Sequence, residues 1–289
     1  MIRGRLAHAL DRRFEPLHHR LERLEADLGQ LHEDIGALAR RLDEQLMPTL
    51  RLLAGRDAEN RDRLADARSD PDYELAYQEP EPLVTVIVPT HQRSELLRSR
   101  ALPAVLGQTH TRLEVLVIGD GPDPAAEQVV READDERVRW TSTSQRYVYP
   151  DERRHWLAAS TLARNEGYRG ARGHWLFDVD DDDSLPRDAI ASLLGAARAG
   201  RAEVVQGVIL SHAPDGSMAP IAEVQPDELP LIGAGALVHA CLRFFEREHV
   251  ASALGVPGDR FRAERMLRAG VRVERLNRVT YDYYPSSLW

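Results

Sequence analysis

The residues best suited to chemistry in this sequence are four consecutive aspartates that follow a short apolar run. The segment reads Gly173-His-Trp-Leu-Phe-Asp-Val-Asp-Asp-Asp-Asp-Ser-Leu-Pro186. Carboxylates held side by side repel one another, and a divalent cation turns that repulsion into coordination by hard oxygen ligands. Because the run follows a segment that should be a buried strand, we expect a metal-binding loop at the carboxyl end of that strand. Such a loop indicates phosphate chemistry.

Two other interpretations of the acidic run are weaker. A solvated acidic surface usually lies in a polar tract, whereas this run follows apolar residues. A calcium loop that starts at Asp178 would use alternate carboxylates at Asp180 and Asp182. However, Asp183 stands where that loop needs glycine, and Ala189 stands where it needs a bidentate carboxylate.

The composition limits the class of protein. The chain has 289 residues, of which 43% are hydrophobic and 29% charged, enough for one globular domain and an appendage. A net charge of −9 argues against a nucleic-acid partner. Cys241 is the only cysteine, which excludes a disulfide within the chain and a cysteine-rich zinc site. No segment has the pattern of a signal peptide or a transmembrane helix, so we expect a cytoplasmic protein.

A heptad pattern runs through the N-terminal region. Alternating spacings of four and three define the a and d positions of a coiled coil: Leu10, Phe14, Leu17, Leu21, Leu24, Leu28, Leu31, Ile35, Leu38 and Leu42. A parallel second copy would pair Arg20 with Glu25 and Asp27 with His32, so we expect a homo-oligomer. Packing of this helix against the chain's own globular domain is the alternative, and a trimer or tetramer stays open.

The chain is therefore expected to have three parts. Residues 1–54 form the coiled-coil helix, residues 55–81 form a polar linker, in which the charged stretch from Arg56 to Asp72 is a polar helix or a linker, and residues 82–289 form the globular domain. Within the last part, β-branched runs at 83–88, 113–118 and 175–177 alternate with helical patterns at 94–106, 124–132 and about 157–170. This rhythm predicts an α/β fold with a mostly parallel sheet, and ligands bind at the carboxyl ends of such strands.

Several phrases in this order resemble the family 2 glycosyltransferases, which have the GT-A fold, a Rossmann-like sheet with flanking helices. They are Val84-Thr-Val-Ile-Val-Pro-Thr-His-Gln-Arg93, Gln108-Thr-His-Thr-Arg-Leu-Glu-Val-Leu-Val-Ile-Gly-Asp-Gly121, Ala163-Arg-Asn-Glu-Gly167, Ala171-Arg-Gly173 and Asp180-Asp-Asp-Asp183. The resemblance runs from Leu83 to about Tyr284 and leaves the heptad region outside. It implies a hexosyltransferase-type enzyme that uses a nucleotide-sugar donor.

The resemblance also implies which residues bind the nucleotide. Thr90 and Asp120 match the positions that hold the base, and Arg93 follows Thr90 on the same rim. A carboxylate can accept the imide N–H of uracil, so a UDP-sugar is favoured. Gly119 and Pro122 depart from the family pattern, in which an acidic residue and a serine stand there, and this leaves the identity of the base open. An ordinary turn residue is the alternative role for Asp120.

For the diphosphate and metal, the resemblance places the Asp-x-Asp element on Asp180, Asp181 and Asp182. Asp182 is the expected ligand of Mn²⁺ or Mg²⁺, and Asp180 is a ribose or metal contact, with Asp183 in support. Arg164 and Asn165 match an Arg-Asn pair of the family; an arginine there would neutralise diphosphate charge, and a solvated position on the helix surface is the alternative for Arg164. Asp178, one alternation earlier, is expected to be structural.

An inverting displacement at the anomeric carbon needs a base to take the proton of the acceptor hydroxyl. Asp259 matches the late acidic motif of the family and is the predicted catalytic base, with a helix N-cap as its structural alternative. The acceptor is predicted to be a hydroxyl on a glycan or on another cell-surface or secondary-metabolite precursor. The rival functions are a nucleotidyltransferase and a non-catalytic nucleotide-binding assembly protein. No lysine occurs from Leu83 onward, which disfavours the lysine-containing phosphate loop of the first rival.

Overall fold

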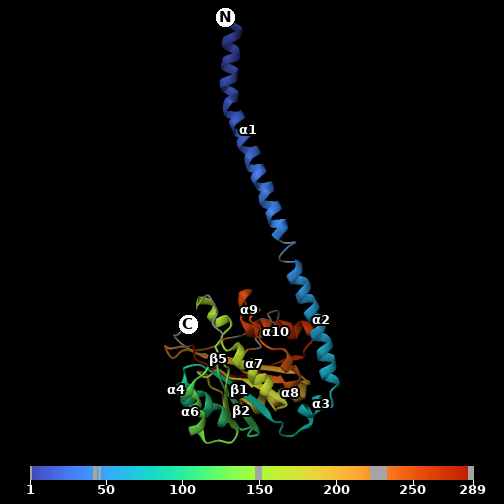
Figure 1. The fold of residues 1–289 in the computed structure, drawn as a ribbon, viewed down its shortest axis with the longest axis vertical. Coiled ribbons are helices and arrows are strands. Elements are labelled where there is room, and N and C mark those ends of the chain that lie inside the picture. The colour runs from blue at the N-terminus through green and yellow to red at the C-terminus, as the bar shows by residue number, and fades with distance from the viewer. Residues whose placement is uncertain (1, 42–43, 45–46, 147–151, 222–232, 286–289) are drawn as a thin grey trace. The chain divides into compact units, whose positions relative to one another are not determined.

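A computed structural model describes residues 2–41, 44, 47–146, 152–221 and 233–285. The chain divides into two compact units, Met1–Arg56 and Asp57–Trp289. The first unit is dominated by the helix α1 (Ile2–Arg41), the long blue helix of Figure 1. This confirms that the heptad positions from Leu10 to Leu38 lie on one helix. Among the described residues, no helix combines the length and the apolar character that crossing a membrane requires.

The leucine stripe of α1 is open to solvent. Six of its apolar side chains, each 57–67% exposed, are Leu21, Leu24, Leu28, Leu31, Ile35 and Leu38. Leu42 lies outside the described residues, as do the side chains of Leu10, Phe14 and Leu17. A stripe this narrow and this exposed is typical of a helix that pairs with another helix, and the coiled coil stays a prediction.

The segment expected to be a polar helix or linker is largely helical. The helices α2 (Met47–Ser69) and α3 (Pro71–Gln78) cover most of residues 55–81, and the second compact unit begins at Asp57. Leu64 is buried in α2, and α3 buries Tyr73, Ala76 and Tyr77. Asp70 caps α3 by accepting a hydrogen bond from the backbone N–H of Asp72. Nine of the 23 residues of α2 are charged, so the few buried residues among those described leave no apolar stripe for the sequence to reveal.

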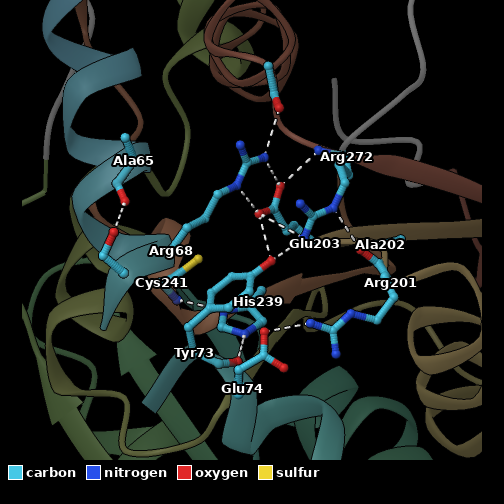
Figure 2. A network of polar contacts seen from close by, with 12 residues as sticks. Ala65, Arg68, Tyr73, Glu74, Arg201, Ala202, Glu203, His239, Cys241 and Arg272 are labelled. Atoms are coloured by element: carbon cyan, nitrogen blue, oxygen red, sulfur yellow. Dashed lines mark hydrogen bonds and ion pairs between the residues drawn. The ribbon is translucent and has the colours of Figure 1, made fainter. Parts of the chain in front are cut away.

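A polar network attaches α2 and α3 to the domain (Figure 2). Both oxygens of Glu203, whose side chain is fully buried, accept 2.7 Å hydrogen bonds from Arg68 of α2. Tyr73 of α3 donates to the same carboxylate at 2.9 Å, and so does the backbone N–H of Arg272. Burial disfavours the charge of Glu203, yet these donors hold its pKa below the ordinary value. The network therefore binds residues far apart in sequence around one carboxylate.

The eight-stranded sheet has the order β3-β2-β1-β4-β7-β5-β6, and β8 pairs with β5. Four neighbouring strands are parallel: β3 (Val138–Ser142), β2 (Leu113–Gly119), β1 (Val84–Thr90) and β4 (Trp175–Asp178). Beyond β4, β7 (Ala236–His239) runs antiparallel to both β4 and β5 (Val204–His212). β6 (Met218–Pro220) is antiparallel to β5, whereas β8 (Val273–Tyr283) is parallel to it. The predicted mostly parallel α/β sheet is confirmed.

Helices bury both faces of this sheet (Figure 1). In β1, Val84, Val86 and Val88 join one core cluster with α6 (Pro124–Ala133) and α8 (Ala189–Gly200), while Ile87 joins the other. The second cluster includes α7 (Thr161–Gly170) and α10 (Gly258–Ala269). Burial on both faces accounts for the continuous apolar runs of these strands.

Shorter helical pieces complete the domain. The helix expected at 94–106 contains α4 (Ser94–Leu96), a π-helical turn at Leu97–Ala101 and α5 (Leu102–Leu106). Pro103 lacks the N–H of a regular helix, which accounts for an irregular turn just before it. Glu152–Leu157 and Ala240–Phe244 are 3-10 helices, and α9 spans Val250–Ala253.

Candidate active site

The candidate site lies where three parallel strands end side by side. Thr90, the last residue of β1, is paired with Gly119, the last residue of β2. The next residue, Asp120, donates its backbone N–H to the carbonyl of Thr90 at 2.8 Å. Asp178 ends β4 on the other side of β1, and Val179 donates to the carbonyl of Ile87 at 3.0 Å. The parallel sheet therefore brings the polar ends of β1 and β2 and the acidic run to one edge.

Thr90 and Arg93 hold the middle of the acidic run. The Thr90 hydroxyl, predicted to contact the base, donates a 2.7 Å hydrogen bond to Asp181 Oδ2 in this structure. Arg93 Nη1 lies 2.6 Å from Asp182 Oδ2 and 3.4 Å from Asp181 Oδ1. Arg100 also donates to the backbone carbonyl of Asp182. These contacts orient the carboxylates and offset part of their mutual repulsion.

The acidic run holds more negative charge than its surroundings neutralise. Burial, with the charges of Asp182 and Asp180, raises the pKa of Asp181 to about 7, although Thr90 and Arg93 oppose the shift. Burial also raises the pKa of Asp182. A divalent cation would relieve this crowding, because it favours ionised carboxylates.

Asp183 attaches the acidic run to β8 and to the residue that follows it. Its fully buried carboxylate accepts 2.8 Å hydrogen bonds from the Tyr281 hydroxyl and from the backbone N–H of Tyr284. Tyr281 in turn accepts a 3.0 Å hydrogen bond from the backbone N–H of Asp180. Burial and the charge of Asp180 raise the pKa of Asp183 to about 8. Asp183 therefore fixes the loop to β8, and the aromatic tail segment at Tyr281 and Tyr284 packs beneath the acidic run.

Asp120 lies in a pocket of basic side chains. The residue is 4% exposed, and burial raises the pKa of its carboxyl group. Arg146 Nε lies 3.7 Å from Asp120 Oδ2 and Arg146 Nη2 lies 2.8 Å from His155 Nε2, while the charge of His91 also acts on Asp120. Among the described residues, Asp120 Oδ1 and Arg146 Nε are buried without a hydrogen-bond partner. An unpaired acceptor beside an unpaired donor is typical of a site that binds a polar ligand.

Backbone strain surrounds the same pocket. Gln92 and Ser160 both have positive φ, at 54° and 56°, without being glycine. Gln92 is stabilised by a 2.7 Å hydrogen bond from its N–H to Asp123, and the backbone of Ser160 is close enough to Asp120 to act on the pKa of that carboxyl group. Left-handed non-glycine residues cluster at functional sites, where the surrounding structure holds them in place.

The predicted Arg164-Asn165 pair lies on α7, but the two side chains have different environments. Arg164 is 3% exposed and reaches both Asp180 and, at 3.5 Å, Asp178 Oδ2. Asn165 instead bonds both backbone groups of Arg247, each at 2.9 Å. Asp178, expected to be structural, is buried and accepts a 2.6 Å hydrogen bond from Tyr168.

Asp259 lies in the first turn of α10, whose N-cap is Pro257, so the alternative of an Asp259 N-cap is wrong. A Cβ atom placed on Gly233 would lie 3.1 Å from Asp259 Oδ2, so this loop packs against the carboxylate. Two residues later, Gly235 donates its N–H to the Asp178 carbonyl at 2.8 Å. Because two residues span at most about 7 Å, the loop places Asp259 close to the end of β4.

Among the described residues, no group of three or more His, Cys, Asp and Glu side chains is arranged as a metal site. Mg²⁺ bound with a substrate, however, usually takes one or two protein carboxylates together with phosphate oxygens. Asp180, whose side chain is 37% exposed, and Asp182 at 11% provide that number of hard oxygen donors. The residues therefore fit a metal that the donor diphosphate helps to hold.

Sequence reasoning missed several polar groups at this edge: His155, Arg146, Arg247, His249 and Tyr281. They come from loops, a 3-10 helix and β8, and no motif distinguishes them from the other histidines, arginines and tyrosines of the chain. The four consecutive aspartates were the signal that located the site, because their charge is unusual after an apolar strand.

Comparisons with known proteins point to glycosyltransferases. Residues 85–223 match the family described as Glycosyl transferase family 2. Glycosyltransferase GlyA of Streptococcus pneumoniae is 28% identical over 110 residues, 38% of this chain and 14% of that protein. The GalNAc(5)-diNAcBac-PP-undecaprenol beta-1,3-glucosyltransferase of Campylobacter jejuni is 29% identical over 43% of this chain and 37% of its own length. Succinoglycan biosynthesis protein ExoO of Rhizobium meliloti is 27% identical over 58% of this chain and 45% of its own.

Solved structures show the same fold. S. aureus TarS 1–349 in complex with UDP superposes with a TM-score of 0.54 and 17% identity, over 70% of this chain and 60% of that one. The complex of the same protein with UDP-GlcNAc gives 0.55 and 16%, over 71% and 59%. The chain thus spans less than two thirds of each of these relatives. Residues 85–223 therefore resemble the family 2 glycosyltransferases, and the chain shares the fold of these solved structures.

Proposed function

We propose that this protein is a glycosyltransferase that moves a sugar from a nucleotide-diphosphate donor to a hydroxyl acceptor. Two features at one sheet edge carry the proposal. The first is Asp120, whose buried Oδ1 has no hydrogen-bond partner among the described residues, and the second is the crowded acidic run. The first suits the base of a nucleotide, and the second suits a metal-bound diphosphate.

The donor in this proposal is a UDP-sugar. Asp120 Oδ1 accepts the imide N–H of uracil, and the neighbouring donors of Arg146 and His91 suit the carbonyl oxygens on either side of that N–H. Thr90 acts through Asp181, which it orients by its 2.7 Å hydrogen bond. The complexes of TarS with UDP and UDP-GlcNAc, on the same fold, support this choice of donor.

Asp182 and Asp180 would hold Mn²⁺ or Mg²⁺, which supplies positive charge to the departing diphosphate. Arg164 adds a buried cation beside Asp180. Arg93 neutralises part of the charge on Asp181 and Asp182 and orients both side chains. Both arginines thereby keep the acidic run folded before the donor binds.

Asp259 takes the proton of the acceptor hydroxyl, which makes the reaction a direct displacement with inversion at the anomeric carbon. Its half-buried carboxylate on α10 lies against the loop at Gly233, near the end of β4. The acceptor is a glycan or another cell-surface precursor, in keeping with the names of the Campylobacter and Rhizobium relatives.

The leucine stripe of α1 binds a second copy of the chain in this proposal. Opposite charges at Arg20 and Glu25 favour a parallel pair, because they flank the seam at g and e positions. Two catalytic domains joined in this way would act on one polymeric acceptor at higher local concentration. The protein is proposed to work in the cytoplasm.

The test is donor-dependent thermal stabilisation. Melting curves are recorded with Mn²⁺ and a panel of nucleoside diphosphates and nucleotide sugars, because a ligand of the native state raises the midpoint. A manganese-dependent rise with uridine nucleotides, followed by sugar transfer in the presence of a glycan acceptor, is the expected result. If no nucleotide shifts the midpoint, the protein is a non-catalytic assembly protein instead.

A further inference from the structure

The segment Phe245–His249 connects the 3-10 helix at 240–244 to α9, and it is held unusually firmly for a loop. Arg262 of α10 donates to the Phe245 carbonyl at 2.6 Å. Arg169 of α7 binds Glu246 through both oxygens, at 2.8 and 2.7 Å. Arg265 of α10 lies 2.7 Å from Glu248. Contacts from two helices therefore fix a segment that has no regular structure of its own.

These contacts fix the position of Arg247, which lies in the middle of the segment. The side-chain amide of Asn165 donates to the Arg247 carbonyl and accepts from its N–H, both at 2.9 Å. The Arg247 side chain is only 9% exposed, and its Nη2 lies 3.6 Å from Asp178 Oδ2. Both backbone groups of Arg247 are thus occupied by a side chain of α7, which leaves the guanidinium aimed at the end of β4.

The charges around Asp178 do not balance. Arg164, Arg247 and Arg262 all lower the pKa of this carboxylate against the effect of burial, and only Arg164 also reaches Asp180. Three largely buried guanidinium groups thus lie near two carboxylates, the buried one of Asp178 and the half-exposed one of Asp180. Within the described part of the chain, Arg247 Nε and Arg262 Nη2 are buried N–H groups without a hydrogen-bond acceptor, whereas Arg164 Nη1 lies 3.5 Å from Asp178 Oδ2. Unpaired buried cationic donors favour a bound anion.

The segment at residues 245–249 runs between the two places where the proposed donor would bind, the base site at Asp120 and the diphosphate site at the acidic run. Two residues beyond Arg247, His249 is close enough to Asp120 for that carboxylate to act on its pKa. The first turn of α7 follows the same line, since the backbone of Ser160 is close enough to Asp120 to act on the pKa of that carboxyl group, and Arg164 reaches Asp180. With the base at Asp120, both segments lead from the base to the diphosphate.

We propose that Arg247 is a donor-binding residue that contacts the diphosphate together with Arg164, and that Asn165 is the positioning residue that holds Arg247 there. This inference rests on the proposed function. It reassigns Asn165, which was expected to contact the donor itself, because both ends of its amide are already bonded to the Arg247 backbone. A guanidinium suits this role because its planar donors match phosphate oxygens.

The test compares the binding of uridine diphosphate with that of uridine, by calorimetry in the presence of Mn²⁺. In Arg247→Gln, we expect uridine diphosphate to bind about 10- to 100-fold more weakly, while uridine changes by less than about twofold. Arg247→Lys keeps a point charge without the planar fork, so part of the preference for the diphosphate should return. Arg243→Gln is the matched control, since Arg243 lies in the preceding turn and donates to the carbonyl oxygens of Ala240 and Ala171.

The role of Asn165 is tested in the same assay. Asn165→Ala should also lose the preference for the diphosphate, and the double variant with Arg247→Gln should be no weaker than Arg247→Gln alone, because both changes remove one interaction. Melting curves without ligand show which variants fold, and Arg247→Lys replaces Arg247→Gln if the latter does not. An unchanged preference for the diphosphate in the folded Arg247 variants would overturn this inference and leave the proposed function standing. Failure of the unaltered protein to bind either ligand would overturn both.

Discussion

Arg93 and Asp182 form a 2.6 Å ion pair at the centre of the acidic run, and the same guanidinium nitrogen lies 3.4 Å from Asp181. One cation of the protein is therefore shared by two carboxylates. Burial nevertheless raises the pKa of both carboxylates, so a single arginine does not satisfy them. The negative charge of Asp181 and Asp182 that Arg93 does not neutralise is available for the proposed metal.

The first prediction concerns the metal. Asp182→Ala should abolish Mn²⁺-dependent turnover of a nucleotide sugar, because it removes a proposed ligand, and chelation by EDTA should do the same to the unaltered protein. Turnover is measured as release of nucleoside diphosphate over a range of Mn²⁺ concentrations. Asp183→Asn is the comparison: its carboxylate faces Tyr281 and Tyr284, so its main effect should be a lower melting temperature. Full Mn²⁺-dependent activity in Asp182→Ala would exclude Asp182 as a ligand.

The second prediction concerns the catalytic base. Asp259→Asn should lower kcat by about 10²- to 10⁴-fold, because the amide cannot take the acceptor proton. Donor affinity should stay the same, since the substitution changes no proposed donor contact. Steady-state kinetics and donor titration separate these two effects. Glu264→Gln, on the same helix and bonded to Arg260, is a control that should retain activity.

The third prediction concerns the attachment of α2. Arg68→Ala removes both charged hydrogen bonds to Glu203, whose carboxylate is fully buried, and should lower the free energy of unfolding by about 3 kcal/mol. Chemical denaturation measures this change. In Arg68→Ala combined with Glu203→Gln, the loss should be smaller than the sum of the two single losses. Simple additivity would mean that the two residues do not interact in solution.

The fourth prediction concerns pH. His239 is neutral in the fold, because Nδ1 accepts the Cys241 N–H at 3.1 Å and Nε2 faces the Tyr73 carbonyl at 3.1 Å. Burial lowers its pKa from 6.5 to about 4. Between these values the unfolded chain binds the proton and the folded chain does not, so stability falls as pH decreases from about 6.5 to about 4. The loss reaches about 3 kcal/mol.

This pH effect is measured by urea unfolding across that range. His239→Gln removes the titrating group, so the slope of stability against pH should become shallower even if the variant is less stable overall. An unchanged slope would assign the acid sensitivity to other groups.

The fifth prediction concerns the leucine stripe. Leu24→Glu with Leu31→Glu should convert the oligomer into a monomer, because charges replace two seam residues that are each 59% exposed in the single chain. Light scattering after size-exclusion chromatography measures the mass. Ala26→Glu with Ala37→Glu adds the same charge at the f and c positions and should leave the oligomer intact. A monomeric unaltered protein would show that the stripe does not bind a second copy.

The sequence by itself determined the parallel part of the sheet and the place of the candidate site at its edge. β1, β2 and β4 are β-branched or aromatic runs that end in polar residues, and this pattern depends only on local chemistry. The acidic run could also be predicted as a cation-binding candidate, because four adjacent carboxylates after a buried strand repel one another unless a cation binds them. The α1 helix followed from its heptads in the same way.

Only the tertiary structure decided which side chains meet at that edge. Arg247 pairs with Asn165 across 82 positions of sequence, and Arg68 pairs with Glu203 across 135. Such contacts leave no periodic trace, because each depends on one arginine among many whose local surroundings look alike. For the same reason residues 57–78 have the sequence pattern of a linker: two helices with few buried apolar residues are held by a polar network that exists only after the chain has folded.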